Sequence, residues 1–131
     1  MPDHGSPSAF GAEVRDFDPV NFLRDRKFIK VMSRSIQLGV ASSNLAVTDA
    51  KVAPGVMDPD RFGVVFGAGR MTCHPSELAA AVNVCRSEGG FDIDKWGPEA
   101  LASIAPLWLL RQLPNMPASH VSIDHNACGP N

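Results

Sequence analysis

The sequence predicts an α/β fold in which helices cover a small, incomplete mixed sheet, and three observations support this prediction. Residues 32–50 carry apolar side chains at helical spacing, which indicates a long helix. Arg61–Phe66 contains a nearly continuous apolar run, which is typical of a buried strand. Ser119–His125 alternates Val121 and Ile123 with polar residues, which is typical of a half-buried strand. Helical and strand segments that follow one another along a chain favour a layered α/β domain.

Start and stop signals give the helices in order. Asp18 precedes Pro19, so the aspartate can cap a short helix whose first residue is the proline. Ser33 is the expected N-cap of the long helix, and Pro54-Gly55 ends that unit. The remaining helices are expected to begin at Pro75 (with the apolar stripe Leu78, Ala81, Val82 and Cys85, and an end at Gly89-Gly90), at Pro98 and at Pro106.

The predicted sheet has only two strands, which are too few to make it stable by itself. A sheet normally needs more than two strands, or a packed helical layer, to be stable by itself. Each predicted strand would also leave a row of unpaired backbone groups along its edge. We therefore expect a partner strand to complete the sheet.

Composition describes a chain that can build a core, and it excludes several functions. Of 131 residues, 44% are hydrophobic and 20% are charged, with a formal net charge of -2. This balance gives no electrostatic case for binding nucleic acid or an anionic membrane. No apolar run approaches the roughly 20 residues of a membrane-spanning helix, and Met1–Ala9 does not read as a signal peptide. Three cysteines without a Cys-x-x-Cys pair fit free thiols in a reducing cytoplasm.

Three local patterns could carry chemistry, and each also has a purely structural interpretation. Gly67-Ala68-Gly69 follows a predicted strand, but Thr72 stands where a dinucleotide fingerprint has its third glycine, so a tight turn is the alternative. Cys73-His74 could be a nucleophile and its base, although adjacent residues rarely face each other productively. His120, His125 and Cys128 could bind a metal, although the two histidines would point to opposite faces of a strand.

A set of short motifs runs through the chain in a recognisable order. They are Phe17-Asp18-Pro19, Asp25-Arg26-Lys27, Met32-Ser33-Arg34, Gln37-Leu38-Gly39-Val40-Ala41, Thr48-Asp49-Ala50, residues 59–69 with their Gly-Ala-Gly exit, Ala105-Pro106, Asn115-Met116-Pro117-Ala118, Val121-Ser122-Ile123 and Gly129-Pro130-Asn131. In this order and spacing the motifs resemble the N-terminal half of the β-ketoacyl synthases, the condensing enzymes of the thiolase-like fold. The resemblance covers nearly the whole chain.

The resemblance implies a partial domain. Residues 17–131 would form part of the N-terminal domain of the thiolase-like fold, and residues 1–16 a flexible arm. The family's nucleophilic cysteine lies a few residues beyond Gly-Pro-Asn at a helix N-terminus, and its histidines and lysine come later. No catalytic residue is therefore expected within the chain, and Cys128, which precedes the motif, is not the nucleophile.

Four positions acquire expected roles from the resemblance. Arg70 stands where the family has an apolar gate to the acyl pocket, so a cation there departs from the family pattern and puts an ordinary long-chain substrate in doubt. Trp108 stands where the family approaches the pocket of its partner subunit. A surface arginine and a core tryptophan are the alternatives. Val121 and Ile123 would lie in a strand, Ser119–Ile123, that pairs with its own copy in a dimer or with another chain. No cofactor and no metal are implied.

Two functions follow from these expectations. The first is a truncated or split β-ketoacyl synthase, an acyltransferase of fatty acid or polyketide synthesis that works with acyl carrier protein and is inactive in the absence of its nucleophile. The second is a non-catalytic interaction subunit that completes its sheet with a partner chain. Whether the chain is itself an enzyme is left open, and a cytoplasmic location is expected for both.

Overall fold

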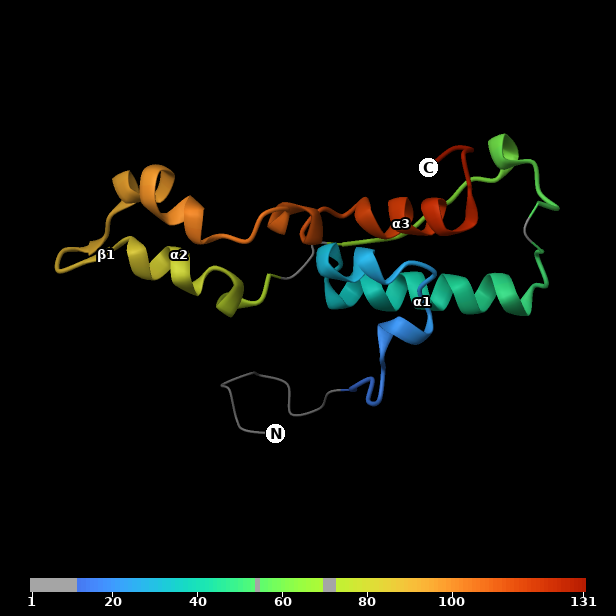
Figure 1. Ribbon diagram of the computed structural model, residues 1–131, viewed down its shortest axis with the longest axis horizontal. Coiled ribbons are helices and arrows are strands. Elements are labelled where there is room, and N and C mark those ends of the chain that lie inside the picture. The colour runs from blue at the N-terminus through green and yellow to red at the C-terminus, as the bar shows by residue number, and fades with distance from the viewer. Residues whose placement is uncertain (1–11, 54, 70–72) are drawn as a thin grey trace.

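A computed structural model describes residues 12–53, 55–69 and 73–131. Figure 1 shows an elongated molecule in which two groups of helices lie end to end. We call residues 17–53, 55–66 and 116–131 the main lobe, and residues 75–104 the outer lobe. A short 3-10 helix, Trp108–Arg111, lies on the chain between them.

The long helix of the main lobe confirms the sequence prediction. Helix α1 spans Arg34–Asp49, and the Ser33 hydroxyl accepts the Ile36 N–H at 3.5 Å as its cap. Its buried face consists of Ile36, Gly39, Val40 and Ala41. A Cβ atom at Gly39 would lie 2.7 Å from Cζ of Phe66, so the phenyl ring packs on the helix only because this residue has no side chain.

The predicted strand Ser119–His125 is wrong, because these residues belong to helix α3, Met116–His125. Val121 is 6% exposed and Ile123 is 59% exposed. Two residues apart, these side chains would share one face of a strand, but they diverge on a helix. Pro117 in the first turn suits a helix start, and α3 packs alongside α1 in the main lobe, with the two helices running in the same direction (Figure 1). A short alternating pattern does not distinguish a strand from a helix, and here the packing against α1 favours the helix.

The predicted strand Arg61–Phe66 is also not part of a sheet. Asp58 caps a 3-10 turn, Pro59–Arg61, and the chain then runs extended through residues 62–69. Among the described residues, the sheet consists of β1, Arg86–Ser87, paired antiparallel with β2, Gly90–Phe91. The fold is therefore rich in helix with a small two-stranded sheet, which is compatible with part of an α/β domain.

The outer lobe forms around a small core of its own. The helix expected at Pro75 begins as a 3-10 turn, Pro75–Glu77, and continues as α2, Ala79–Val84. The hairpin β1–β2 follows, so α2 ends before Gly89-Gly90. Further 3-10 turns at Ile93–Lys95 and Leu101–Ser103 flank a π turn at Trp96–Ala100, where a helix was expected at Pro98. The buried residues are Ala81, Cys85 and Ala100, with Val84, Trp96 and Ile104 packed around them.

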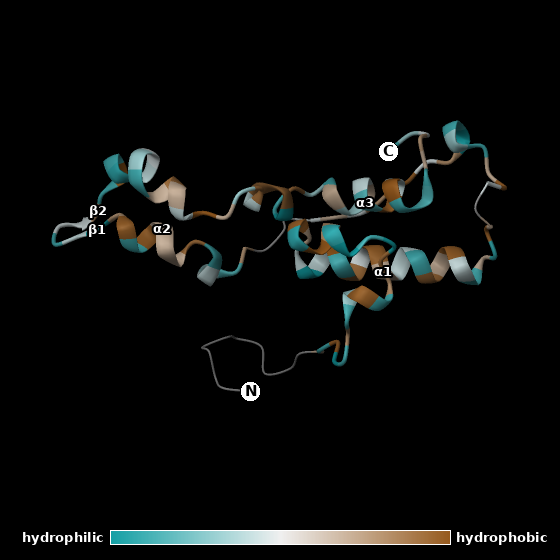
Figure 2. Ribbon diagram, in the orientation of Figure 1, coloured by the Kyte–Doolittle hydropathy of each residue, from teal (hydrophilic) through white to brown (hydrophobic). Residues whose placement is uncertain are grey.

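The larger core lies between α1, α3 and the extended segment. Two capped 3-10 helices, Pro19–Asn21 after Asp18 and Arg26–Val31 after Asp25, bring the N-terminal residues onto it. The first of these is the predicted Asp18–Pro19 helix in 3-10 form. Figure 2 shows apolar residues along both α1 and α3. The buried cluster consists of Leu23, Met32, Ile36, Val40, Val64, Ala118, Val121 and Ala127.

Within the described part of the chain, no helix has the length and apolar character needed to cross a bilayer.

Candidate functional site

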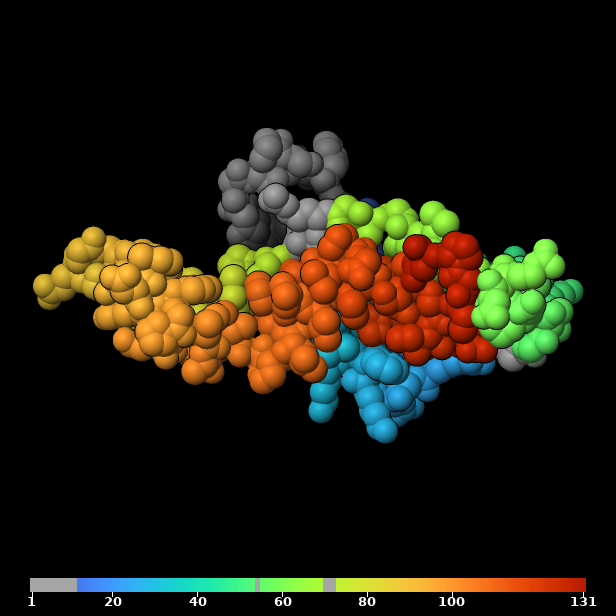
Figure 3. Space-filling view, turned by 90° about the horizontal axis from the view of Figure 1, so that it is seen from above, coloured from blue at the N-terminus to red at the C-terminus, as the bar shows by residue number. Residues whose placement is uncertain are grey.

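The C-terminal turn is tied to the start of the extended segment by three backbone hydrogen bonds. Cys128 N–H donates to the Pro59 carbonyl at 2.9 Å, and Gly129 N–H donates to that of Phe62 at 3.0 Å. Val64 N–H in turn donates to the Pro130 carbonyl at 3.0 Å. Figure 3 shows the extended segment alongside α3 at the surface.

Glycines allow this close approach of the two backbones. A Cβ on Gly63 would collide with the Pro130 carbonyl oxygen. A Cβ on Gly129 would lie 2.9 Å from the carbonyl carbon and oxygen of Phe62. In both cases the obstructing atoms belong to the backbone, which cannot rotate away as a side chain can. The Gly-Pro-Asn motif is therefore fixed beside residues 62–64.

Beyond this turn the extended segment has the character of a strand whose partner is missing. Val64 is 8% exposed, Val65 is 99% exposed, and Phe66 packs against the main core. This alternation is the period of a β-strand with one buried face. From Val65 to Ala68, no backbone group is hydrogen-bonded to the backbone of any described residue. The segment thus offers both an open edge and an uncovered apolar side chain.

A polar cluster joins α1 to the end of α3. The Asn44 amide nitrogen donates to the Phe22 carbonyl at 2.6 Å and to the Asp124 carboxylate at 3.1 Å. Its oxygen is therefore the acceptor that lies 2.6 Å from Nε2 of His125, so Nε2 carries the proton. The Arg24 guanidinium donates to the Asp124 carbonyl, also at 2.6 Å. No local sequence pattern predicts this cluster, because residues 44 and 125 are far apart along the chain.

The two histidines of α3 do not form a metal site with Cys128. His120 is 3% exposed and packs its ring edge against Phe28, with ring centroids 5.6 Å apart. His125 instead bonds Asn44, and Cys128 contacts Asn126. Within residues 12–53, 55–69 and 73–131, no group of three or more possible ligands could hold a metal ion.

Burial sets the ionisation of these histidines. It lowers the pKa of both His120 and His125 from the usual 6.5, against the opposing influence of the Asp124 carboxylate. Nε2 of His120 is buried without a hydrogen-bond partner among the described residues, which also disfavours charging it. Both imidazoles are therefore held in the neutral form by the fold.

Acidification is expected to destabilise the protein through these histidines. The unfolded chain takes up protons on them as the pH falls through about 6.5, whereas the folded chain resists protonation. Their contribution to stability is thus complete above that pH and is lost below it. The melting temperature should fall between about pH 7.5 and pH 5.5. The variant His120→Leu should show a smaller fall. An unchanged fall in His120→Leu would contradict this account.

The cysteines do not form the nucleophile–base pair that the sequence suggested. Cys85 is fully buried, and burial raises the pKa of its thiol, with Asp92 and Glu99 adding to the effect. The Cys73 thiol contacts the His74 carbonyl at 3.4 Å, while Nδ1 of His74 lies 2.7 Å from the Ser76 hydroxyl. The His74 ring therefore caps the turn Pro75–Glu77, and the suggested Cys73–His74 pair is not formed. Gly67-Ala68-Gly69 continues the extended segment, well before the turn at Pro75.

Trp108 is held within its own chain by a carboxylate. Its indole N–H donates to the Glu77 carboxylate at 2.8 Å, and the Gln112 amide donates to the same oxygen at 3.4 Å. The Arg111 guanidinium lies 3.7 Å from the other Glu77 oxygen. This network joins the start of the outer lobe to the helix Trp108–Arg111. Arg70, the other predicted pocket residue, lies outside the described residues.

Comparison with known proteins identifies the family. The family model described as "Beta-ketoacyl synthase, N-terminal domain" matches residues 3–131. The chain belongs to this family. The resemblance drawn from the ordered motifs is thereby confirmed.

A curated relative agrees with this β-ketoacyl synthase assignment. The chain is 32% identical over 122 residues to 3-oxoacyl-[acyl-carrier-protein] synthase 2 of Synechocystis sp. (strain PCC 6803). The match covers 93% of this chain and 26% of the relative, so the chain spans about a quarter of that protein's length. No solved structure matches the chain significantly.

The dimer contact predicted from the resemblance must be revised, because its residues do not form a strand. Ser119–Ile123 is helical in this β-ketoacyl synthase chain, so it offers no strand edge for pairing with a second copy. Val121 belongs to the core, whereas Ile123 is exposed. Association through this stretch stays a prediction, and any contact there would use the outer face of α3.

Proposed function

We propose that this chain is the N-terminal structural portion of a β-ketoacyl synthase and acts only together with polypeptide that supplies the nucleophilic cysteine and the histidines. The parent reaction would be the decarboxylative condensation of an acyl thioester with a malonyl thioester on acyl carrier protein, in fatty acid or polyketide synthesis. The family membership supports this reaction class. We also propose that the chain forms part of the layered α/β structure of the thiolase-like fold.

The extended segment around Val65 is the observation that carries the proposal. Its inner side chains pack on α1 and α3, while Val65 faces away and is 99% exposed. An isolated strand with one apolar face covered and the other bare is a template for a further strand and a further layer. The Pro130 carbonyl already receives the Val64 N–H, so polypeptide continuing from Gly-Pro-Asn would begin beside Val65.

The remaining residues take roles that are part of the same proposal. Arg70 would line the acyl pocket, and Trp108 would approach a partner's pocket as in the family. The indole of Trp108 is oriented by Glu77, so a partner would meet a side chain that is already positioned. The chain by itself would be catalytically silent, because Cys85 is buried with a raised thiol pKa and Nδ1 of His74 is engaged with the Ser76 hydroxyl.

Complementation tests the proposal. The chain is co-expressed with the part of the Synechocystis 3-oxoacyl synthase 2 that follows the matched region, and condensation of acyl and malonyl thioesters is measured. We expect activity from the pair and none from either part alone. Val65→Lys should abolish that activity because the side chain becomes buried on association. Val56→Lys, at a position 71% exposed, is the matched control and should keep it.

The same mixture separates the two functions suggested by the sequence. Co-purification with activity supports the split enzyme. Co-purification without activity, lost in Val65→Lys, would favour a non-catalytic subunit that completes its sheet with another chain. Both variants should melt at the parent temperature when isolated, since exposed positions rarely change stability by more than about 0.5 kcal/mol. Failure of the two parts to associate would overturn the proposal.

A further inference from the structure

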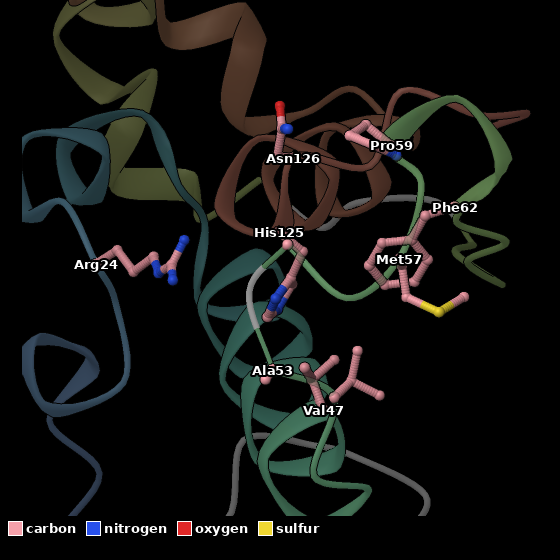
Figure 4. A pocket seen from close by; sticks show the side chains of 10 residues that line it. Arg24, Val47, Ala53, Met57, Pro59, Phe62, His125 and Asn126 are labelled. Atoms are coloured by element: carbon pink, nitrogen blue, oxygen red, sulfur yellow. The ribbon is translucent and has the colours of Figure 1, made fainter.

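A hollow of about 210 Å³ lies in the main lobe. It opens between the end of α1, residues 52–53 and 55–62, and the end of α3 (Figure 4). A second hollow of about 330 Å³ adjoins it and shares Arg24, Val47, Val52 and His125 with it. The lining of the first hollow includes Arg24, Val47, Met57, Phe62 and His125.

The lining is apolar on one side and cationic on the other. Val47, Met57 and Phe62 form the apolar side, and Figure 4 shows Arg24 extending toward the hollow from the opposite side. Among the described residues that line either hollow, none is acidic. Arg24 therefore sets the sign of the charge that either hollow can accept.

The Arg24 guanidinium is oriented by one hydrogen bond and has further N–H donors available. One of its nitrogens donates to the Asp124 carbonyl, which belongs to the last turn of α3. A guanidinium has five N–H groups, so this bond leaves most of them unused. No carboxylate of the described residues forms an ion pair with Arg24. The nearby Asp124 carboxylate is buried, bonded to Asn44, and outside both linings.

The His125 side chain lines both hollows and is held by a hydrogen bond. Its Nε2–H donates to Asn44, whose amide is itself held by Phe22 and Asp124. A ring held in this way cannot turn aside to fill the space. The hollow is thus preformed by residues of α1, α3 and the segment around Arg24.

We propose that this hollow binds a small carboxylic acid as its anion, with the carboxylate paired to Arg24 and the alkyl chain against Val47, Met57 and Phe62. Arginine binds carboxylates through paired, charge-assisted hydrogen bonds. The volume lies below that of drug-sized pockets, so the ligand is a short-chain acid rather than a long fatty acid. Val65 is not part of the lining, and the site does not depend on the proposed condensing function.

Hexanoate, hexanol and acetate are the probes that test this site. Binding to the whole chain is followed by amide chemical shifts in NMR titrations, with His125, Met57 and Val47 as reporters. We expect hexanoate to bind at least about tenfold more tightly than hexanol, because only the carboxylate can form charge-assisted hydrogen bonds with Arg24. Acetate, which has no chain to pack on the apolar side, should bind more weakly than hexanoate. Equal binding of hexanoate and hexanol would overturn the proposal.

Two pairs of variants locate the binding. Arg24→Gln should remove the preference for hexanoate over hexanol, whereas Lys27→Gln, nearby but outside the lining, should keep it. Because Arg24 also bonds α3, a second pair avoids that contact. Met57→Glu should weaken hexanoate binding by repulsion, and Met57→Gln should weaken it much less. Hexanoate binding that survives both Arg24→Gln and Met57→Glu would place the ligand elsewhere.

Discussion

Replacing Ile36 by alanine should lower the free energy of unfolding by about 2–5 kcal/mol. The side chain is completely buried on α1, where it packs in the cluster that contains Val40, Val64 and Val121. Truncation would leave a cavity at the junction of α1, α3 and the extended segment, none of which can move in without breaking contacts with the others. Urea unfolding followed by circular dichroism gives the change directly.

The matched control for Ile36 lies on the same helix. Leu45 is 57% exposed, so Leu45→Ala should change the free energy of unfolding by no more than about 0.5 kcal/mol. Both substitutions place a strong helix former on α1, which separates lost packing from altered helix propensity. Equal destabilisation by the two variants would show that the core is not centred on Ile36.

Replacing Gly63 by alanine should separate the Gly-Pro-Asn turn from the extended segment. The added methyl group would collide with the Pro130 carbonyl oxygen, which is a backbone atom and accepts the Val64 N–H. Relief requires the two backbones to move apart, at a cost of about 1–3 kcal/mol for overpacking. Hydrogen exchange at Val64 and Gly129 should accelerate, because both amides donate across this junction.

Gly67 provides the comparison for Gly63, since it lies further along the same extended segment. A Cβ atom there would meet nothing within 4 Å, so Gly67→Ala should leave both amides and the melting temperature near their parent values. If Gly63→Ala and Gly67→Ala behaved alike, the close approach at Pro130 would not be a determinant of the fold.

The features set by neighbouring residues could be predicted from the sequence. Ser33 and the apolar spacing after it placed α1 within two residues of its observed limits, and Asp18 caps the predicted turn at Pro19. These signals act within a few residues, so they are present in the sequence itself. The ordered motifs likewise identified the family, because they depend on spacing along the chain.

The features set by contacts between distant residues could not be predicted from the sequence. Val121 and Ile123 alternate as in a strand, and only packing against α1 makes that stretch a helix. Residues 62–69 have the composition of a strand, but from Val65 to Ala68 no backbone hydrogen-bonding partner lies among the described residues. The Asn44–His125 and Glu77–Trp108 bonds join residues 81 and 31 positions apart, which no local pattern reveals.

The condensing activity of the complemented pair tests the central claim most directly, namely that the edge and outer face at Val65 receive the rest of a β-ketoacyl synthase. The account predicts activity for the parent pair and for Val56→Lys, and loss of activity for Val65→Lys, with all three chains equally stable alone. Full activity of the Val65→Lys pair would contradict it, because a lysine cannot be buried unpaired at a strand that has gained its partner.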